Sequence, residues 1–130
     1  MTHGQHLFEY AVIRVAPRVE REEFLNVGVI VYCHALKFLE VSFEINEKRL
    51  SAFSDSLDIS ELQKTLHAFQ QIGMGGVHGG TIGKLPVPER FRWLTAARST
   101  IVQTSSVHLG LCVDPHETLE KLHEQLVTIN

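Results

Sequence analysis

Two apolar segments near the start of the chain have the residue pattern of β-strands. Residues 7–15 (LFEYAVIRV) are rich in β-branched and aromatic side chains, which favour extended structure. Pro17 ends this strand because proline has no N–H to donate to a ladder. Residues 22–33 (EEFLNVGVIVYC) are the longest nearly continuous apolar run, and we interpret them as the central strand of a small sheet. The charges at 18–23 alternate in sign, which predicts a solvated, partly self-paired connection.

The second strand carries an anomaly on one of its two faces. Its odd positions from Leu25 to Cys33 are all apolar, whereas its even positions include Asn26 and Gly28. A glycine inside a strand weakens it unless something approaches closely, and that something could be a helix, another backbone or a ligand. Residues 36–45 then alternate apolar and polar side chains. The two segments therefore predict an antiparallel hairpin with one buried face.

Helix signals dominate the rest of the chain. Helices often begin at a short polar side chain, which accepts a hydrogen bond from a first-turn amide that has no partner in the helix. Proline also favours a first turn, because it has no N–H to leave unpaired there. The predicted starts are Asn46 for a helix over 47–53, Ser60 with Gln63 for a helix ending at Gly73, Pro86 and Pro88 for a helix over 89–96, and Asp114 with Pro115 and Glu117 for the final helix. Between the last two helices, residues 98–107 predict a fourth strand, which 108–112 either continue or end with a turn.

This order of elements predicts an α+β domain, with a small, mostly antiparallel sheet of about four strands and helices packed on one side. We expect a single domain over residues 1–130, with a frayed N-terminus at about 1–6. Residues 73–85 contain six of the nine glycines. We interpret them as a glycine-rich loop that is either merely flexible or cradles an anion with its bare amides.

Composition narrows the class of protein. With 44% hydrophobic and 21% charged residues, the chain is typical of a globular domain. Its formal net charge of −3 argues against a general nucleic-acid binder, which usually has a net basic face. No run approaches the ~20 apolar residues of a membrane helix and no signal peptide is evident, so we expect a cytoplasmic location without membrane association. Cys33 and Cys112 are expected to be buried, reduced thiols.

The densest polar region lies between Arg90 and Asp114 and is a candidate binding surface. Arginine and hydroxyl side chains can bind phosphate or carboxylate, because guanidinium offers a planar fork of donors, and Trp93 could stack a base. The alternative is an edge strand with a solvated Ser/Thr face. If this strand neighbours the Asn26 strand, Asn26, Gly28, Arg98, Gln103 and His108 could line one surface. The candidate binding residues are these five together with Arg92, Trp93, Ser99 and Thr100.

Catalytic and metal-binding patterns are weak in this sequence. A nucleophile needs a positioned base, and His108 with Cys112 or a nearby serine lies on a segment whose structure the sequence leaves open. His116, Glu120 and His123 have a helical spacing that could ligate a divalent ion, but the same spacing fits a solvated face. We therefore predict no catalytic residue, no metal and no cofactor.

Two blocks of the sequence carry a family resemblance: residues 10–33 (YAVIRVAPRVEREEFLNVGVIVYC) and residues 90–115 (RFRWLTAARSTIVQTSSVHLGLCVDP). They resemble an uncharacterised bacterial family catalogued as domain of unknown function 3037, over about Leu7 to Val127. Ala97 stands where the family pattern leads us to expect proline. The resemblance implies no activity and no catalytic residues. It implies a bacterial cytoplasmic protein that is often encoded beside kinase-like proteins resembling the HipA toxin kinases, an association that suggests a small partner subunit or regulator.

Three functions remain open from the sequence. The first is a non-catalytic binding or regulatory module for a protein partner, such as a HipA-like kinase, using an exposed strand edge or the Arg98 surface. The second is a phosphate- or nucleotide-directed enzyme, or a nucleic-acid binder, using an Arg98/His108 surface. The third is a self-associating structural domain, a homodimer formed through the hairpin 24–45. The lack of a clear nucleophile–base pattern favours the first.

Overall fold

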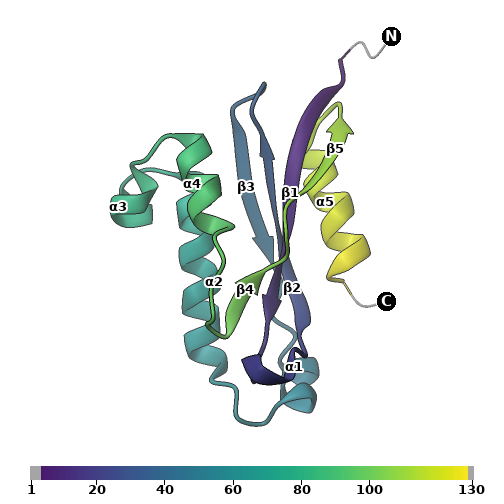
Figure 1. Cartoon of the computed structure of the whole chain (residues 1–130), viewed down its shortest axis with the longest axis vertical. Coiled ribbons are helices and arrows are strands. Elements are labelled where there is room, and N and C mark those ends of the chain that lie inside the picture. The colour runs from purple at the N-terminus through teal and green to yellow at the C-terminus, as the bar shows by residue number, and fades with distance from the viewer. Residues whose placement is uncertain (1–3, 129–130) are drawn as a thin grey trace.

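The computed structural model describes residues 4–128, and its core is a five-stranded antiparallel sheet between two layers of helices (Figure 1). The strands are β1 (His6–Val15), β2 (Leu25–Cys33), β3 (Phe38–Phe43), β4 (Val102–Thr104) and β5 (His108–Cys112). The helices are α1 (Glu47–Phe53), α2 (Ile59–Met74), α3 (Gly80–Gly83), α4 (Val87–Leu94) and α5 (Pro115–Leu126), with 3-10 turns η1 (Val19–Arg21) and η2 (Val77–Gly79). The predicted α+β class is confirmed. Of the frayed segment expected at 1–6, residues 1–3 lie outside the described residues, and His6 is already the first residue of β1.

The two inner strands are β1 and β2, so the run that the sequence predicted as a central strand lies inside the sheet. The strand order is β3-β2-β1-β4, and β5 pairs with the half of β1 that β4 leaves free. Where the sequence predicted one strand, two short strands therefore share one edge of β1. Between them, the Ser105 hydroxyl accepts a hydrogen bond from the Val12 amide at 2.9 Å. This side chain satisfies a β1 donor at the point where the edge strand is interrupted.

Helices cover both faces of the sheet, whereas the sequence predicted one. The helices α2 and α4 pack on the face that carries Ile30 and Tyr32, and α5 packs on the face that carries Val29 and Val31. Figure 1 shows the sheet between these two layers. Strands buried on both faces have nearly continuous apolar runs, and this double burial explains the long apolar run of β2.

A bulge in β2 changes which side chains face which layer. Ile13 pairs with Gly28 while Arg14 pairs with Asn26, so Val27 is an extra residue in the ladder. Beyond the bulge the alternation is reversed: Val27 joins the α2 core, and the Asn26 Nδ2 donates to the Leu126 carbonyl of α5 at 3.1 Å. A regular strand would place Asn26 and Gly28 on the same face. The bulge places them on opposite faces.

Gly28 is required by the close approach of the neighbouring strand. A Cβ atom at this position would lie 2.4 Å from the carbonyl oxygen of Ser42 and 3.1 Å from the Ile13 Cδ1 atom. The sequence allowed a helix, another backbone or a ligand to lie close to Gly28. In the structure the close neighbour is the backbone of β3.

The helix starts follow capping chemistry. Asn46 accepts a hydrogen bond from the Arg49 amide at 3.0 Å, and Asp114 accepts one from the His116 amide at 3.0 Å, so both predicted caps are confirmed. The predicted Ser60 cap is wrong, because Asp58 accepts from the amide three residues ahead of it and α2 begins one residue before Ser60. No helix within residues 4–128 has the length and apolar character needed to cross a bilayer.

The glycine-rich segment 73–85 is folded into η2 and α3. The Gly76 amide donates to the Gly83 carbonyl at 2.8 Å, which closes the segment on itself. The buried Arg90 side chain fastens it to the rest of the domain, because its Nε donates to the Leu85 carbonyl at 3.0 Å and its Nη1 donates to two carbonyls at the end of α2. Since the Gly76 amide bonds within the segment, it is not available to cradle an anion.

Candidate functional site

The structure separates the candidate binding residues instead of gathering them on one surface. Asn26 faces α5, and Gln103 shares that face because both residues pair with Arg14 from opposite sides. Trp93 and Arg98 lie on the other side of the sheet, beside Phe69 of α2. The predicted convergence of Asn26 with Arg98 therefore does not occur.

Arg98 caps the end of α4. Its Nη1 donates to the Leu94 carbonyl at 2.8 Å and its Nη2 donates to the Trp93 carbonyl at 2.7 Å. Its Cζ lies 4.8 Å from the centroid of the Trp93 ring and 5.0 Å from that of the Phe69 ring. Burial lowers the pKa of the guanidinium. These bonds direct both terminal nitrogens of the guanidinium to backbone carbonyls at the end of its own helix. The adjacent Ser99 and Thr100 are exposed.

Arg92 is exposed on the opposite side of α4. It lines a hollow of about 440 Å³ with Glu9, Tyr32, His34 and residues of α4. The Tyr32 hydroxyl and the His34 Nδ1 atom are 2.8 Å apart. Burial raises the pKa of Tyr32, and the nearby Glu9 carboxylate raises it further. Arg92 thus belongs to a different surface from the other predicted site residues.

The side chains considered as catalytic pairs have structural roles. The His108 and Tyr10 rings pack with their centroids 5.2 Å apart, and the Ser105 hydroxyl is bonded to the backbone of β1. Cys33 and Cys112 are free and buried, as predicted. Burial raises the pKa of the Cys112 thiol, which disfavours the reactive thiolate.

Two histidines of α5 contact acidic side chains, Glu40 of β3 and Glu44, which directly follows β3. His123 has its Nδ1 atom 2.8 Å from the Ser42 hydroxyl and its Nε2 atom 3.5 Å from the Glu44 carboxylate. This hydroxyl–imidazole–carboxylate row has the order of a nucleophile, a base and an orienting acid. We assign it to docking of α5, because only 18% of the His123 side chain is exposed between the helix and the strand. Among residues 4–128, no group of three His, Cys, Asp or Glu side chains is placed to hold a metal ion.

The other histidine, His116, predicts a pH dependence of stability. Its Nδ1 atom lies 2.9 Å from a Glu40 oxygen and its Nε2 atom 3.2 Å from a Glu120 oxygen. The hydrogen bond that His116 donates to the Glu40 carboxylate raises the pKa of His116, and the charges of Glu40, Glu120 and Asp114 raise it further. The protonated form is therefore favoured by folding. Its contribution is complete below the unfolded-state pKa of about 6.5 and is lost as the pH rises through the higher folded-state pKa.

We expect the difference in unfolding free energy between the wild type and His116→Gln to be largest below the ordinary histidine pKa and to shrink as the pH rises above it. Urea unfolding at a series of pH values measures this difference. The control is His78→Gln, which removes a histidine without a hydrogen bond or ion pair in the described chain. A His116→Gln difference that does not change with pH would show that the Glu40 contact contributes nothing.

Arg14, which is not among the predicted site residues, is the centre of a polar row on the sheet. Arg14 lies directly opposite Asn26 of β2 and Gln103 of β4, so the three side chains project from one face about 5 Å apart. We call these three residues the Arg14 row. The Arg14 Cζ lies 4.0 Å from the centroid of the Phe24 ring. The Arg14 Nε and Asn26 Oδ1 atoms are buried and have no hydrogen-bond partner in the part of the chain that is described.

An apolar strip lies along the outer strand of the sheet. The apolar residues at odd positions 107–113 are all exposed, and Leu111 pairs directly with the exposed Leu7 of β1. The other side chains of β5 face α5, where Cys112 is buried. We call the exposed set the β5 strip: Leu7 (58% exposed), Val107 (39%), Leu109 (66%), Leu111 (59%) and Val113 (66%).

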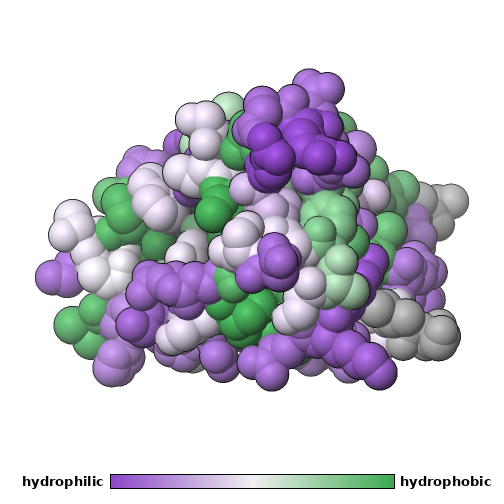
Figure 2. Space-filling view, turned by 90° about the horizontal axis from the view of Figure 1, so that it is seen from below, coloured by the Kyte–Doolittle hydropathy of each residue, from purple (hydrophilic) through white to green (hydrophobic). Residues whose placement is uncertain are grey.

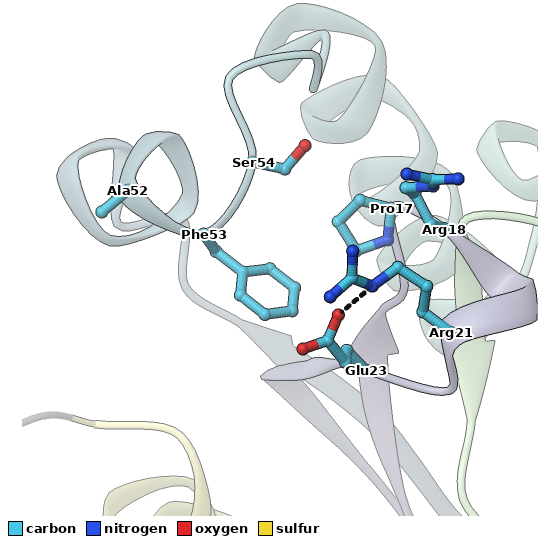
Figure 3. Close-up of a pocket in the computed structure, with 7 residues that line it drawn as sticks. All are labelled: Pro17, Arg18, Arg21, Glu23, Ala52, Phe53 and Ser54. Atoms are coloured by element: carbon cyan, nitrogen blue, oxygen red, sulfur yellow. Dashed lines mark ion pairs between the residues drawn. The ribbon is translucent and has the colours of Figure 1, made fainter.

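The end of the molecule that carries α1 and the β1–β2 connection has a different character. Figure 2 looks onto this end, where hydrophilic residues predominate and hydrophobic ones lie in small separate groups. A hollow of about 260 Å³ lies here between the connection and Phe53 of α1 (Figure 3). Its arginines are paired by their own neighbours, Arg18 with Glu20 at 2.9 Å and Arg21 with Glu23 at 2.6 Å. The predicted self-pairing of this connection is confirmed.

These features define a small α+β domain. The apolar β5 strip lies beside the first half of β1, and the Arg14 row lies across the second half of β1. The chain belongs to the family described as Protein of unknown function (DUF3037), whose model matches residues 10–127. The family resemblance noted in the sequence is therefore confirmed over nearly the whole chain. No curated protein and no solved structure matches the chain.

Proposed function

We propose that the chain is a non-catalytic binding module that takes up an extended segment of a partner protein along the free edge of β5. The observation that supports this proposal is the β5 strip. Contiguous exposed apolar surface marks interaction sites, and this one lies on a strand that pairs on one side only. An added strand would bond to the free backbone groups and cover the apolar side chains together.

The two edges of the sheet differ in their protection. Exposed edge strands usually carry proline, or lysine and other charged residues, which prevent unwanted pairing. The β3 edge carries Glu40 and Glu44, whereas residues 107–113 (VHLGLCV) contain no lysine, proline or acidic residue. The unprotected edge is the one that suits a partner. This comparison favours β5 over the hairpin 24–45 that the sequence suggested for self-association.

The partner we expect is a protein with an apolar extended segment, and a HipA-like kinase is the first one to test because the family resemblance implies that association. The module would act on its partner by occupying that segment. A regulatory role fits a small domain in which the His123 and His116 contacts dock α5 on the sheet and Arg98 caps α4.

Capture from the native host tests the proposal when three baits are compared. These are the wild-type chain, the double variant Leu109→Glu/Leu111→Glu, and the control Val77→Glu, which places the same charge at a 73% exposed position outside the strip. We expect one partner to be retained by the wild type and by the control and to be lost with the double variant. Equal recovery with all three baits, or no partner with any, would refute the proposal.

Self-association is the competing use of the same edge, because a second copy could pair its own β5 in the antiparallel direction. Light scattering of the wild type and of the Leu109→Glu/Leu111→Glu variant distinguishes the two. We expect both to be monomers. A wild-type dimer that the double variant dissociates would replace the protein partner by a second copy of this chain.

A further inference from the structure

We propose that the Arg14 row binds a small oxyanion that also carries an O–H group, such as a hydrogen phosphate, a phosphate monoester or a hydroxycarboxylate. This site is separate from the β5 strip and does not depend on the function proposed for it. The first argument is the charge of Arg14. Among residues 4–128 its guanidinium makes no ion pair and no hydrogen bond, although Arg18, Arg90 and Arg98 are all held by protein oxygens.

The second argument is the pair of unmet groups beside this charge. The Arg14 Nε–H is a buried donor without an acceptor, and the facing Asn26 Oδ1 is a buried acceptor without a donor. Buried polar groups in native proteins are nearly always paired, so each unmet group requires an explanation. The Asn26 amide cannot turn over freely, because its Nδ2 already donates to the Leu126 carbonyl.

These two groups specify the chemistry of the ligand. Arg14 requires an acceptor and Asn26 requires a donor within the reach of one small molecule. An oxyanion with an O–H group offers both, whereas a fully deprotonated anion offers only acceptors. Gln103 lies directly across from Arg14 on the other side and can supply an amide donor to the same anion.

The surroundings hold the arginine in place for this role. The Phe24 ring lies against the guanidinium, with its centroid 4.0 Å from Cζ, and guanidinium–ring stacking leaves the edge of the planar fork for bidentate contacts. Lysine would lack the planar fork that this arrangement uses.

Side-chain NMR of the uniformly ¹⁵N-labelled chain tests the site with inorganic phosphate and sulfate as probes at matched ionic strength. Sulfate has the shape of phosphate but carries no proton near neutral pH. We expect the Arg14 Nε–H resonance to shift saturably with phosphate, with an affinity several-fold higher than for sulfate. The Arg18 Nε–H, paired to Glu20 at 2.9 Å, is the internal control and should not saturate.

Two variants complete the test. Arg14→Lys should remove the assigned resonance and the saturable response of neighbouring amides, and Gln103→Leu should weaken phosphate binding several-fold. If a variant fails to fold, the wild-type titration alone decides. An Arg14 response that is linear like that of Arg18, or equal for phosphate and sulfate, would overturn the proposal. So would an Nε–H already hydrogen bonded to Asn26 and insensitive to both anions.

Discussion

Gly28→Ala is expected to lower the free energy of unfolding by about 3 kcal/mol, since overpacking in a closely packed interior has a cost of this order. The new Cβ atom would lie 2.4 Å from the Ser42 carbonyl oxygen, a distance that real Cβ atoms do not tolerate. The obstacle is backbone, so relief requires β3 to move away from β2. That movement would strain the hairpin and the α2 core that rests on Val41. Urea unfolding followed by the fluorescence of Trp93 measures the loss.

Gly110→Ala is the matched control for this prediction. It adds the same methyl group to another strand glycine, where the nearest atoms are the outer carbons of the Phe8 ring at 2.6 and 2.7 Å. A ring can turn away where a backbone carbonyl cannot, so we expect a loss of only about 1 kcal/mol. Equal losses for the two variants would show that the Ser42 carbonyl is not what requires Gly28.

Arg90→Met is expected to lower the free energy of unfolding by about 3 kcal/mol, because hydrogen bonds from charged groups contribute about 1.5–3 kcal/mol each and buried carbonyls left unpaired have a further cost. The Arg90 Nη1 donates to the Ile72 and Gly73 carbonyls, both at 2.9 Å, and its Nε donates to the Leu85 carbonyl at 3.0 Å. The first two acceptors are last-turn carbonyls of α2, which have no partner within their own helix. Methionine fills similar space without any donor.

Arg92→Met is the control for the charge and the helix position, because Arg92 is an exposed arginine of the same helix. We expect it to change stability by less than about 0.5 kcal/mol. Hydrogen exchange adds a second measurement: in Arg90→Met the amides of residues 73–85 should exchange faster, while those of α5 should not. If Arg90→Met proves as mild as Arg92→Met, the segment 73–85 is held by its own backbone bonds and not by Arg90.

The elements that were predictable depend on local chemistry. The Asp114 cap, the Asn46 cap and the alternation of 36–45 involve residues close together in sequence, so the pattern alone determines them. The side of the sheet that each helix covers is not local. It follows from the bulge at Val27 and from the path of α5, and neither has a signature in the sequence.

The candidate site shows the same limit. Arg14 and Gln103 are brought together by the register of β1 with β4, which joins residues far apart in the chain. The sequence did contain one sign of the site, because Arg14 interrupts the face of the strand that Phe8, Tyr10 and Val12 share. Arg98 looked equally suited to an anion, but the turn after α4 folds its guanidinium back onto the carbonyls of Trp93 and Leu94. Within the described chain, the guanidinium of Arg98 is bonded to backbone carbonyls and that of Arg14 is not, and this difference depends on backbone geometry that residue types do not reveal.

The use of the β5 edge by a partner is tested most directly by amide hydrogen exchange of the chain alone and in complex with the captured protein. If the partner adds a strand to β5, the outward-facing amides of residues 107–113 should become strongly protected in the complex, while exposed amides around Val77 keep their rates. Protection confined to any other surface, with residues 107–113 exchanging equally fast in both states, would contradict the proposed function.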